Sequence, residues 1–279
     1  METRIYKKEN SLSFFKLLKG SATDIYKSRF LARQLAERDI KAQYRQSYLG
    51  IIWAFIMPIT TAIVWIFLSS SGTVQLSDTG ISYPVYVFSG TLIWSIFKDA
   101  LVMPTTSTSS ARGILSKINF PKEALILSGI YKMLFNTLFK VGLLFILMII
   151  YKVGFSFSLL LFPLGLLVLV FIGVAIGLII TPFSMLYKDI GKIINLGLSF
   201  FMYVTPVVYA MPDKGLMKTL MELNPLTYVI GITRDMLFGG SFAYLTPYFA
   251  IVLMCLPILV LGLVWYRLSI PVIVERLSA

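Results

Sequence analysis

The sequence contains no histidine and only one cysteine, Cys255. Histidine is the residue most often used for proton transfer near neutral pH and for transition-metal ligation, so its absence argues against a hydrolase or a metalloenzyme. A single cysteine cannot form an intrachain disulfide or a thiolate metal cluster. We therefore predict no catalytic residue and no metal site in this chain, and we interpret Cys255, which lies within an apolar run, as a packing residue.

Two further patterns are missing. The phosphate-binding pattern GxxxxGK[ST] does not occur, because Gly191-Lys192 has neither the upstream glycine nor a following serine or threonine. Carboxylates are absent from the middle of the long apolar runs, since Asp99, Glu123 and Asp189 lie at the ends of these runs, where they are poorly placed to relay protons or bind sodium. We expect no cofactor in this chain. ATP and Mg²⁺ are expected to bind to a separate partner subunit.

Charged residues are scarce and unevenly placed. They make up 14% of the chain, whereas 57% of the residues are hydrophobic, a balance typical of a protein surrounded by lipid. In a soluble protein the net charge of +12 would favour nucleic acid as a partner. Here 11 of the 25 lysines and arginines lie between Arg4 and Arg45, before the first long apolar run. This position predicts contact with membrane lipids and no binding of nucleic acid.

The long apolar runs predict six spanning helices, because about 20 residues without uncompensated charge are needed to cross a bilayer. The six runs are residues 48–70, 79–97, 125–151, 159–180, 193–212 and 245–266. Basic residues concentrate before the first run and between alternate runs, so the positive-inside rule places both termini in the cytoplasm. No cleavable signal peptide is evident, and we expect the first run to act as the targeting signal.

The predicted fold class is therefore an all-α integral membrane protein with several parts. Residues 1–45 form a cytoplasmic N-terminal segment with an amphipathic interface helix, and residues 46–266 form the six-helix transmembrane domain. This domain includes a cytoplasmic loop at 98–122 and a segment of short re-entrant helices at 213–240, between the fifth and sixth spans. Residues 267–279 form a cytoplasmic tail.

The interface helix is predicted over Asp24–Arg45, with Ser21 or Thr23 as its N-cap and Asp24 in its first turn. Such a helix lies along the cytoplasmic interface of the membrane. A plain basic anchor that follows the positive-inside rule explains the same residues, and the two interpretations stay open. The apolar side of the helix consists of Tyr26, Phe30, Leu31 and Leu35.

The loop between the second and third spans ends in Lys117-Ile-Asn-Phe-Pro-Lys-Glu123, where Pro121 marks a helix start with Glu123 in its first turn. Before it, Ile114, Leu115 and Ile118 are expected on one side of a short amphipathic segment. A segment of this kind suits docking onto a cytoplasmic protein. A simple connector is the alternative.

Polar residues recur every four positions in the third span, at Ser128, Lys132, Asn136 and Lys140. This spacing places them on one slowly winding stripe of a helix. An ammonium group in hydrocarbon costs at least a few kcal/mol, so the stripe should face other helices, a wet cavity or the headgroups. A cavity would favour contact with an anionic substrate, whereas snorkelling explains Lys132 equally well.

Aromatic residues gather in and after the fifth span, at Phe200, Phe201, Tyr203 and Tyr209. Amphipathic rings can form a sliding surface for sugars. They also suit the aromatic belts at the membrane interfaces, which need no such function.

Between the fifth and sixth spans, the stretch Leu223–Thr233 is the longest without charge. At 1.5 Å per residue it measures roughly 16 Å as a helix, about half a bilayer. We therefore predict a pair of short re-entrant or interfacial helices, broken at Asn224-Pro225. An ordinary surface loop is the alternative.

Several of these motifs together resemble the type-2 ABC transporter permeases that export polysaccharide. They are Arg38-Asp-Ile-Lys-Ala-Gln-Tyr-Arg-Gln-Ser-Tyr-Leu-Gly50 followed by Trp53 and Pro58, Lys117–Glu123, Asp189-Ile190, Thr205-Pro-Val-Val-Tyr209, and Asn224-Pro-Leu-Thr-Tyr228. Each motif is weak alone, but their order and spacing cover almost the whole chain.

The resemblance implies a homodimer of six-helix subunits in the bacterial cytoplasmic membrane, bound to two copies of a separate ATP-binding-cassette subunit. The first and fifth helices would line a channel, and Lys41 and Arg45 would attract the pyrophosphate headgroup of an undecaprenyl-linked glycan. The outer gate would include Asn224, Pro225 and Tyr228. Contacts with the ATPase would be made by the N-terminal interface helix and by Arg112, Lys117, Phe120, Pro121, Lys122 and Glu123.

Other functions remain open from the sequence alone. The motifs do not distinguish export of O-antigen from export of capsule or teichoic acid, and type-2 permeases for small molecules or drugs share the topology. A membrane enzyme acting on lipid-linked sugars would need clustered acids or histidines at one membrane face, and the sequence offers no such cluster.

Overall fold

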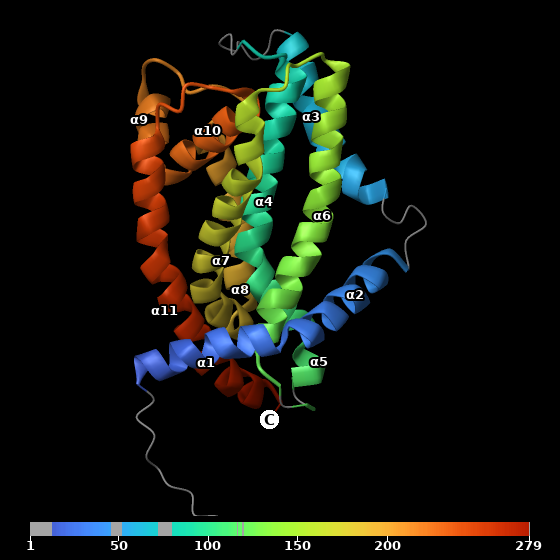
Figure 1. The fold of residues 1–279 in the computed structure, drawn as a ribbon, viewed down its shortest axis with the longest axis vertical. Helices are drawn as coiled ribbons and strands as arrows, with labels where there is room; N and C mark the ends of the chain where they lie inside the picture. The colour runs from blue at the N-terminus through green and yellow to red at the C-terminus, as the bar shows by residue number, and fades with distance from the viewer. Residues whose placement is uncertain (1–12, 46–51, 72–79, 116, 119, 279) are drawn as a thin grey trace, which may run out of the picture.

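Residues 13–45, 52–71, 80–115, 117–118 and 120–278 are described in the computed structural model, and their regular elements are all helical (Figure 1). The predicted all-α class is therefore confirmed for this part of the chain. In chain order the elements are α1 (Phe14–Lys27), α2 (Arg29–Arg45), α3 (Trp53–Ser70), α4 (Tyr83–Ser110), α5 (Arg112–Leu115), α6 (Glu123–Ile150), η2 (Phe157–Leu161), α7 (Phe162–Leu186), α8 (Lys188–Phe201), η3 (Met202–Val204), α9 (Leu216–Leu223), α10 (Pro225–Phe238) and α11 (Leu245–Ser278).

Four stretches are long and apolar enough to cross a membrane: α4, α6, η2 with α7, and α11 up to Arg276. They run side by side along the long axis of the molecule, and α1, α2 and α5 lie at one end of them while α9 and α10 lie near the other (Figure 1). We call these the α1–α2 end and the α9–α10 end. The core of the bundle is centred on α4, whose Phe88, Ile93 and Ile96 are fully buried.

Helices α4 and α7 approach each other closely because α7 carries glycine at two crossing points. A Cβ atom at Gly173 would lie 2.6 Å from the Cβ of Ala100, and one at Gly177 would lie 2.3 Å from the carbonyl oxygen of Leu101. These two glycines, which are four positions apart in α7, thus allow close helix packing within the chain.

Two of the six predicted spans correspond to shorter helices. The first run contains α3, while residues 46–51 lie outside the described part of the chain, as does residue 79 of the second run. The fifth run contains most of α8 and the turn η3, and regular helix ends before Thr205-Pro206. Proline has no N–H to donate, and it forces the residue before it into extended backbone, as the φ of −127° and ψ of 141° at Thr205 show.

Two helices continue past the charged residues that were used to mark the ends of the apolar runs. Helix α4 continues to Ser110, so residues 98–110 are helical although they were assigned to a loop. Helix α11 continues to Ser278, so nearly all of the predicted tail is helical as well. A charged residue ends an apolar run, but it does not interrupt the backbone hydrogen bonds of a helix.

The predicted start of the interface helix was also wrong. Helix α1 already begins at Phe14, and the break before α2 falls at Ser28. Ser21 and Thr23 are not N-caps, since Ser21 is buried and the Thr23 hydroxyl donates to the carbonyl of Lys19 within α1. The two helices lie across the end of the bundle (Figure 1).

The packed face of α2 includes Leu35 of the expected apolar side but not its aromatic residues, of which Tyr26 lies in α1. Ala32 and Ala36 are buried, whereas Tyr26 and Phe30 are exposed. Small alanine side chains let α2 pack closely on α6, and the exposed rings are left free for an apolar surrounding such as lipid.

The α4–α7 crossing generates a prediction. Gly177→Ala should lower the free energy of unfolding by about 1–3 kcal/mol, because the added Cβ meets backbone that cannot move aside. Thermal unfolding in detergent measures this change. Gly142→Ala on α6 is the matched control, since a Cβ there meets nothing within 4 Å; an equal loss of stability in both variants would contradict the close-packing argument.

Candidate functional site

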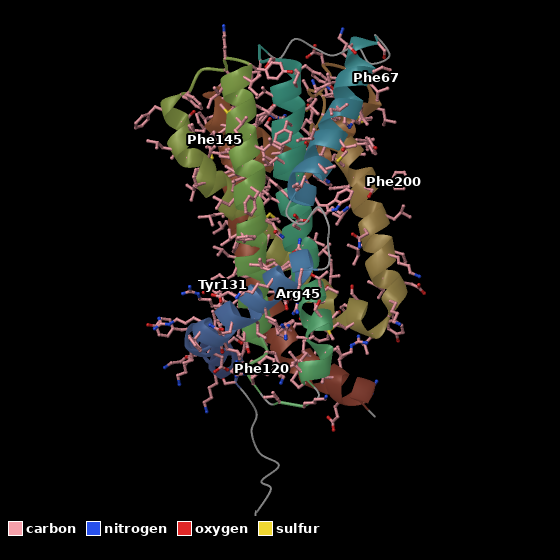
Figure 2. All side chains as sticks on the ribbon, turned by 90° about the vertical axis from the view of Figure 1, so that its right-hand side faces the viewer. Arg45, Phe67, Phe120, Tyr131, Phe145 and Phe200 are labelled. Atoms are coloured by element: carbon pink, nitrogen blue, oxygen red, sulfur yellow. The ribbon has the colours of Figure 1, made fainter. Side chains whose placement is uncertain are left out.

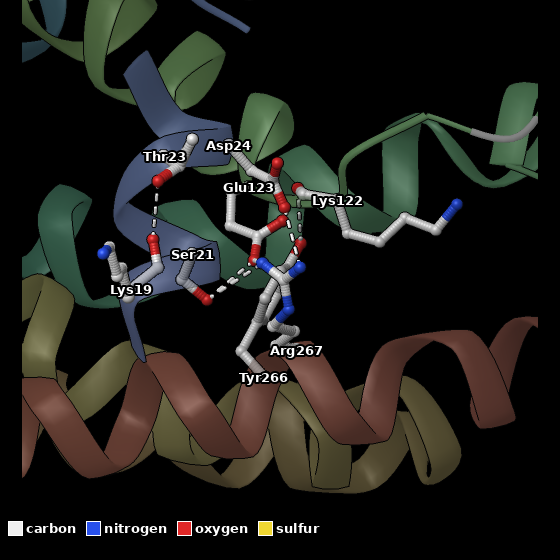
Figure 3. Close-up of polar contacts among 8 residues, drawn as sticks. All are labelled: Lys19, Ser21, Thr23, Asp24, Lys122, Glu123, Tyr266 and Arg267. Carbon is white, nitrogen blue, oxygen red and sulfur yellow. Dashed lines mark hydrogen bonds and ion pairs between the residues drawn. The ribbon is translucent and has the colours of Figure 1, made fainter. Parts of the chain in front are cut away.

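A polar cluster with a buried serine and carboxylate and a half-buried arginine and aspartate joins three helices at the α1–α2 end (Figure 3). Arg267 of α11 forms ion pairs of 2.7 Å with Asp24 of α1 and 2.7 Å with Glu123, the first residue of α6. The Ser21 hydroxyl of α1 donates to the same Glu123 oxygen at 2.8 Å. One guanidinium therefore ties the N-terminal helix, the start of α6 and the end of the last span together.

Two features of the sequence make this cluster possible. A planar guanidinium presents several N–H donors in a fixed geometry, so Arg267 can bind one carboxylate through Nη2 and another through Nη1. Gly20 leaves room for it, since a Cβ there would lie 3.2 Å from the Nη2 atom of Arg267. Glu123 is only 2% exposed, and a buried carboxylate is tolerated when it is paired and hydrogen-bonded. The structure thus places Glu123 inside the protein and not on the surface expected to contact an ATPase.

The segment just before Glu123, residues 117–122, carries exposed side chains. Lys117 and Pro121 are exposed, and Ile118 is 59% exposed. Leu115 is buried, so the expected apolar side of Ile114, Leu115 and Ile118 is split between the core and the surface.

The half-buried residues of the same segment brace it against the bundle. The Lys122 ammonium lies 5.1 Å from the centre of the Phe120 ring, and burial lowers the pKa of Lys122 while the neighbouring Glu123 opposes this shift. The Tyr266 hydroxyl of α11 pairs with Thr108 at 2.7 Å and donates to the Lys122 carbonyl at 3.4 Å. Arg112, in α5, is also half-buried.

The polar stripe of α6 faces α4. A cavity of about 220 Å³ between α2, α4 and α6 is lined by Ser128, Lys132 and Asn136 together with hydroxyl and acidic side chains. The other polar lining residues are Asp39, Asp99, Thr106, Ser107 and Ser110. The stripe thus faces α4 and a polar cavity at this depth.

Lys140, the last member of the stripe, is engaged within the bundle. Its ammonium forms an ion pair of 2.8 Å with Asp99 and donates to Ser95 at 3.1 Å, both on α4. Asp99 therefore neutralises the charge of Lys140 next to the cavity. Lys132, and not Lys140, lines the cavity.

A basic hollow of about 700 Å³ lies on α2 and is lined by Arg38, Lys41, Ala42 and Arg45. Arg38 is paired with Asp39 at 2.7 Å. Within the described residues, neither Lys41 nor Arg45 has an acidic partner, and both side chains are exposed. Since Arg38 lines the hollow and Asp39 lines the cavity, the two spaces adjoin the same turn of α2. Residues 46–50 of the resembling motif lie outside the described part of the chain.

The aromatic candidates of α8 and the turn after it are mostly on the surface. Phe200 is 65% exposed, and it lies on the same side of the molecule as Phe67 of α3 (Figure 2). The Tyr203 ring lies 6.2 Å from that of Trp65 of α3. The Tyr209 hydroxyl donates to the carbonyl of Tyr203, so Tyr209 closes the turn after α8.

Two short helices follow, with their break at Asn224-Pro225 as predicted. The Asn224 side chain caps α10 by accepting from the Leu226 N–H at 3.0 Å, and Pro225 occupies the first helical position. The Tyr228 hydroxyl donates to the carbonyl of Glu222 in α9 at 2.6 Å, which links the two helices. Among the residues of α10, Arg234 is buried.

Local sequence patterns did not predict that Arg267, Asp24 and Ser21 form one cluster, and they did not single out Arg234. Arginine at the end of an apolar run fits the positive-inside rule, and this simple explanation hid the internal contacts. An arginine within the largely apolar stretch of residues 225–238 is the sequence signal that could have pointed to Arg234. Within the described residues, no three acidic or cysteine side chains gather to hold a metal ion.

Residues 31–238 match the family described as ABC-2 type transporter. The chain belongs to this family. It is similar to the O-antigen export system permease protein RfbA of Myxococcus xanthus, with 27% identity over 206 residues that cover 73% of this chain and 78% of that protein. It is also similar to a protein of the same name from Klebsiella pneumoniae, with 23% identity over 218 residues, 75% of this chain and 81% of that protein.

In this ABC-2 family member, the matched residues run from α2 to α10. They include the basic hollow, the cavity, Glu123 and the α9–α10 pair. Asp24 and Arg267, the partners of Glu123, lie outside the matched stretch.

The cluster around Arg267 generates a stability prediction. Arg267→Met should lower the free energy of unfolding by about 3 kcal/mol, because it leaves the Glu123 carboxylate buried without its cation. Adding Glu123→Leu should recover much of this loss. Chemical or thermal unfolding of the purified protein measures both variants.

Arg33→Met serves as the control, since the Arg33–Glu37 pair is exposed and such pairs contribute about 1 kcal/mol or less. If the double variant were as unstable as the sum of its single changes, the pairing of Glu123 with Arg267 would not be what stabilises the cluster.

Proposed function

We propose that this chain is the permease subunit of an ABC exporter that moves a lipid-linked polysaccharide of the O-antigen type across the bacterial cytoplasmic membrane. The match of residues 31–238 to the ABC-2 type transporters carries this proposal. The relatives named as O-antigen export permeases favour a polysaccharide over a drug or an enzyme substrate. Capsule and teichoic acid are related cargoes of the same chemical class.

Six spans complete the proposed topology, with both termini in the cytoplasm. The 18 residues of α3 measure about 27 Å as a helix, close to the roughly 30 Å of a hydrocarbon core. The α8–η3 stretch is shorter, and its exposed apolar side chains, such as Phe200, favour placement within the assembled transmembrane domain. The basic α1–α2 end then faces the cytoplasm, in agreement with the positive-inside rule.

The energy source is a separate ATP-binding-cassette subunit, two copies of which bind a homodimer of this chain. Support comes from the absence of a phosphate-binding pattern in the sequence. Its docking surface consists of α1, α2 and the segment from Arg112 to Lys122, whose exposed side chains include Lys117, Ile118 and Pro121. Glu123 acts indirectly, since it holds this segment against α1 and α11 through Arg267.

The substrate headgroup binds at the basic hollow of α2. A pyrophosphate carries negative charge that unpaired lysine and arginine side chains attract, and Lys41 and Arg45 are both exposed there. The adjoining cavity offers Lys132 and Asn136 as further polar contacts. The glycan then passes along α8 and α3, where Phe200 and Tyr203 supply aromatic surface, towards a gate that α9 and α10 form at the opposite end.

The central experiment reconstitutes the purified chain with its ATP-binding-cassette subunit in proteoliposomes and measures movement of an undecaprenyl-linked glycan. We expect the two proteins to copurify and the movement to require ATP hydrolysis. A complex that hydrolyses ATP without moving any lipid-linked glycan would contradict the proposed cargo, and failure to bind such a subunit would contradict the exporter as a whole.

Removal of the Glu123 carboxylate should uncouple the two subunits. In Glu123→Ala we expect insertion and ATPase binding to persist while glycan-stimulated ATP hydrolysis falls about tenfold, because the docking segment loses its internal support. Glu222→Ala, which removes an exposed carboxylate from α9, is the control. Unchanged stimulation in Glu123→Ala would count against this role.

Charge reversal in the hollow should weaken substrate capture. In the double variant Lys41→Glu/Arg45→Glu we expect the KM for the lipid-linked glycan to rise at least about tenfold, with a smaller effect at high salt, because attraction to the pyrophosphate is replaced by repulsion. Lys27→Glu in α1 controls for a general loss of basic charge. A change in kcat with unaltered KM would show that these residues act at a later step.

A further inference from the structure

Between the end of α8 and α9, the chain passes through residues 204–208, a stretch whose backbone carbonyls bind side chains from other elements. The Val204 carbonyl accepts from Asn224 at 3.1 Å and the Val208 carbonyl accepts from Tyr83 at 3.2 Å. Arg234 donates to the Pro206 carbonyl at 2.9 Å and to the Val207 carbonyl at 2.7 Å. We call residues 204–208 the carbonyl segment.

The carbonyl segment needs these partners because its helix has ended. Pro206 interrupts regular helix, and the residues from Thr205 to Val208 are buried. A buried carbonyl without a hydrogen bond is costly, and inside a membrane protein no bulk water is present to replace the lost helical partner. Side chains of α4 and α10 therefore supply the donors that the helix no longer provides.

Arg234 is the main donor, and its environment is unusual for a charged residue. It is 8% exposed, and no ion pair within the described residues includes it. The same nitrogen that donates to Pro206 donates to the Tyr86 hydroxyl at 2.8 Å, and the guanidinium carbon lies 3.9 Å from the Tyr86 ring centre. A buried cation that binds dipoles and not a carboxylate is expensive, which points to a specific role.

The close fit around Arg234 includes a glycine of α4. A Cβ at Gly90 would lie 2.3 Å from the Nη2 atom of Arg234 and 1.9 Å from the Val207 carbonyl oxygen. The carbonyl segment is thus held between α4 and α10 at this point, with the guanidinium as the bridge.

Asn224 holds the other end of α10. Besides capping the helix, its amide donates to the Thr205 hydroxyl at 2.7 Å and to the Val204 carbonyl. Asn224 and Arg234 therefore fix both ends of α10 to one short piece of chain. Helix α10 cannot move away from the carbonyl segment unless both sets of hydrogen bonds break.

We propose that Arg234 is a positioning residue that locks α10 to the carbonyl segment, so that α10 and the end of α8 move as one unit. In its functional consequence this inference rests on the proposed function: if α8 lines the channel and α10 belongs to the gate, movement of α8 carries the gate with it. The Nη1 and Nη2 donors of Arg234 are directed at backbone carbonyls and at Tyr86.

The first test measures whether the lock exists, and it does not depend on transport. In a Cys255→Ser background, Val207→Cys places a thiol at a fully buried position of the carbonyl segment. A cavity of about 430 Å³ that is lined by Pro206, Tyr86 and Arg234 adjoins this position, so a small thiol reagent has a route once the segment is released. The labelling rate in detergent reports local opening.

We expect Arg234→Met to raise this labelling rate about tenfold, because it removes the hydrogen bonds that Arg234 donates to the carbonyl segment. Arg234→Lys should raise the rate less, because an ammonium keeps some hydrogen bonds but cannot reproduce the arrangement of donors on the planar guanidinium. Lys214→Met removes a charge from an exposed residue of the same region and should leave the rate unchanged. Equal rates in the protein with Arg234 and in a folded Arg234→Met variant would overturn the lock. If Arg234→Met does not fold, an unchanged rate in Arg234→Lys overturns it equally.

The second test connects the lock to export. With the ATP-binding-cassette subunit in proteoliposomes, Arg234→Met should still bind that subunit but lose most glycan movement per ATP hydrolysed, whereas Lys214→Met should retain it. Normal export in Arg234→Met despite fast labelling would overturn the positioning role. If the protein with Arg234 moves no glycan while its labelling contrast with Arg234→Met persists, the proposed function fails and the lock stands.

Discussion

Charged and polar groups that lie between the helices of this bundle are partnered by the protein itself, as three cations show, of which Arg234 is buried and Arg267 and Lys140 are half-buried. Arg267 binds two carboxylates, Lys140 binds Asp99, and Arg234 binds backbone carbonyls and Tyr86. Each of these contacts joins helices that are distant in sequence. Breaking a contact of the buried Glu123 or Arg234 costs more than breaking one at a wet surface, so these residues constrain how the helices lie relative to one another.

The two ends of the molecule use this constraint differently. At the α1–α2 end, charges pair with charges, and the exposed segment before Glu123 rests on a rigid support. At the α9–α10 end, regular helix ends before Pro206, and side chains donate hydrogen bonds to the backbone carbonyls that have lost their helical partners. The first arrangement supports the exposed segment before Glu123, and the second holds α10 to residues 204–208.

Local patterns predicted the apolar runs, the helix break at Asn224-Pro225 and the polar stripe of α6, because each depends on residues close together in the chain. Charged residues were poor markers of helix ends, because α4 continues past Lys98 and α11 continues past Arg267. The predicted N-cap at Ser21 or Thr23 was also wrong, because α1 begins at Phe14 and the Ser21 hydroxyl binds Glu123. The Ser21–Glu123 hydrogen bond links positions 102 residues apart, and no local pattern contains that information.

The extension of α11 to Ser278 changes how the C-terminal residues should be regarded. Ile270 and Ile273 are buried in the same core cluster as Leu115, next to the segment that precedes α6. The C-terminal turns of α11 therefore pack against that segment and are continuous with the rest of the helix. Truncation after Arg267 would remove part of the hydrophobic core, and a fusion partner attached at the C-terminus would be joined to a stiff helix with little slack.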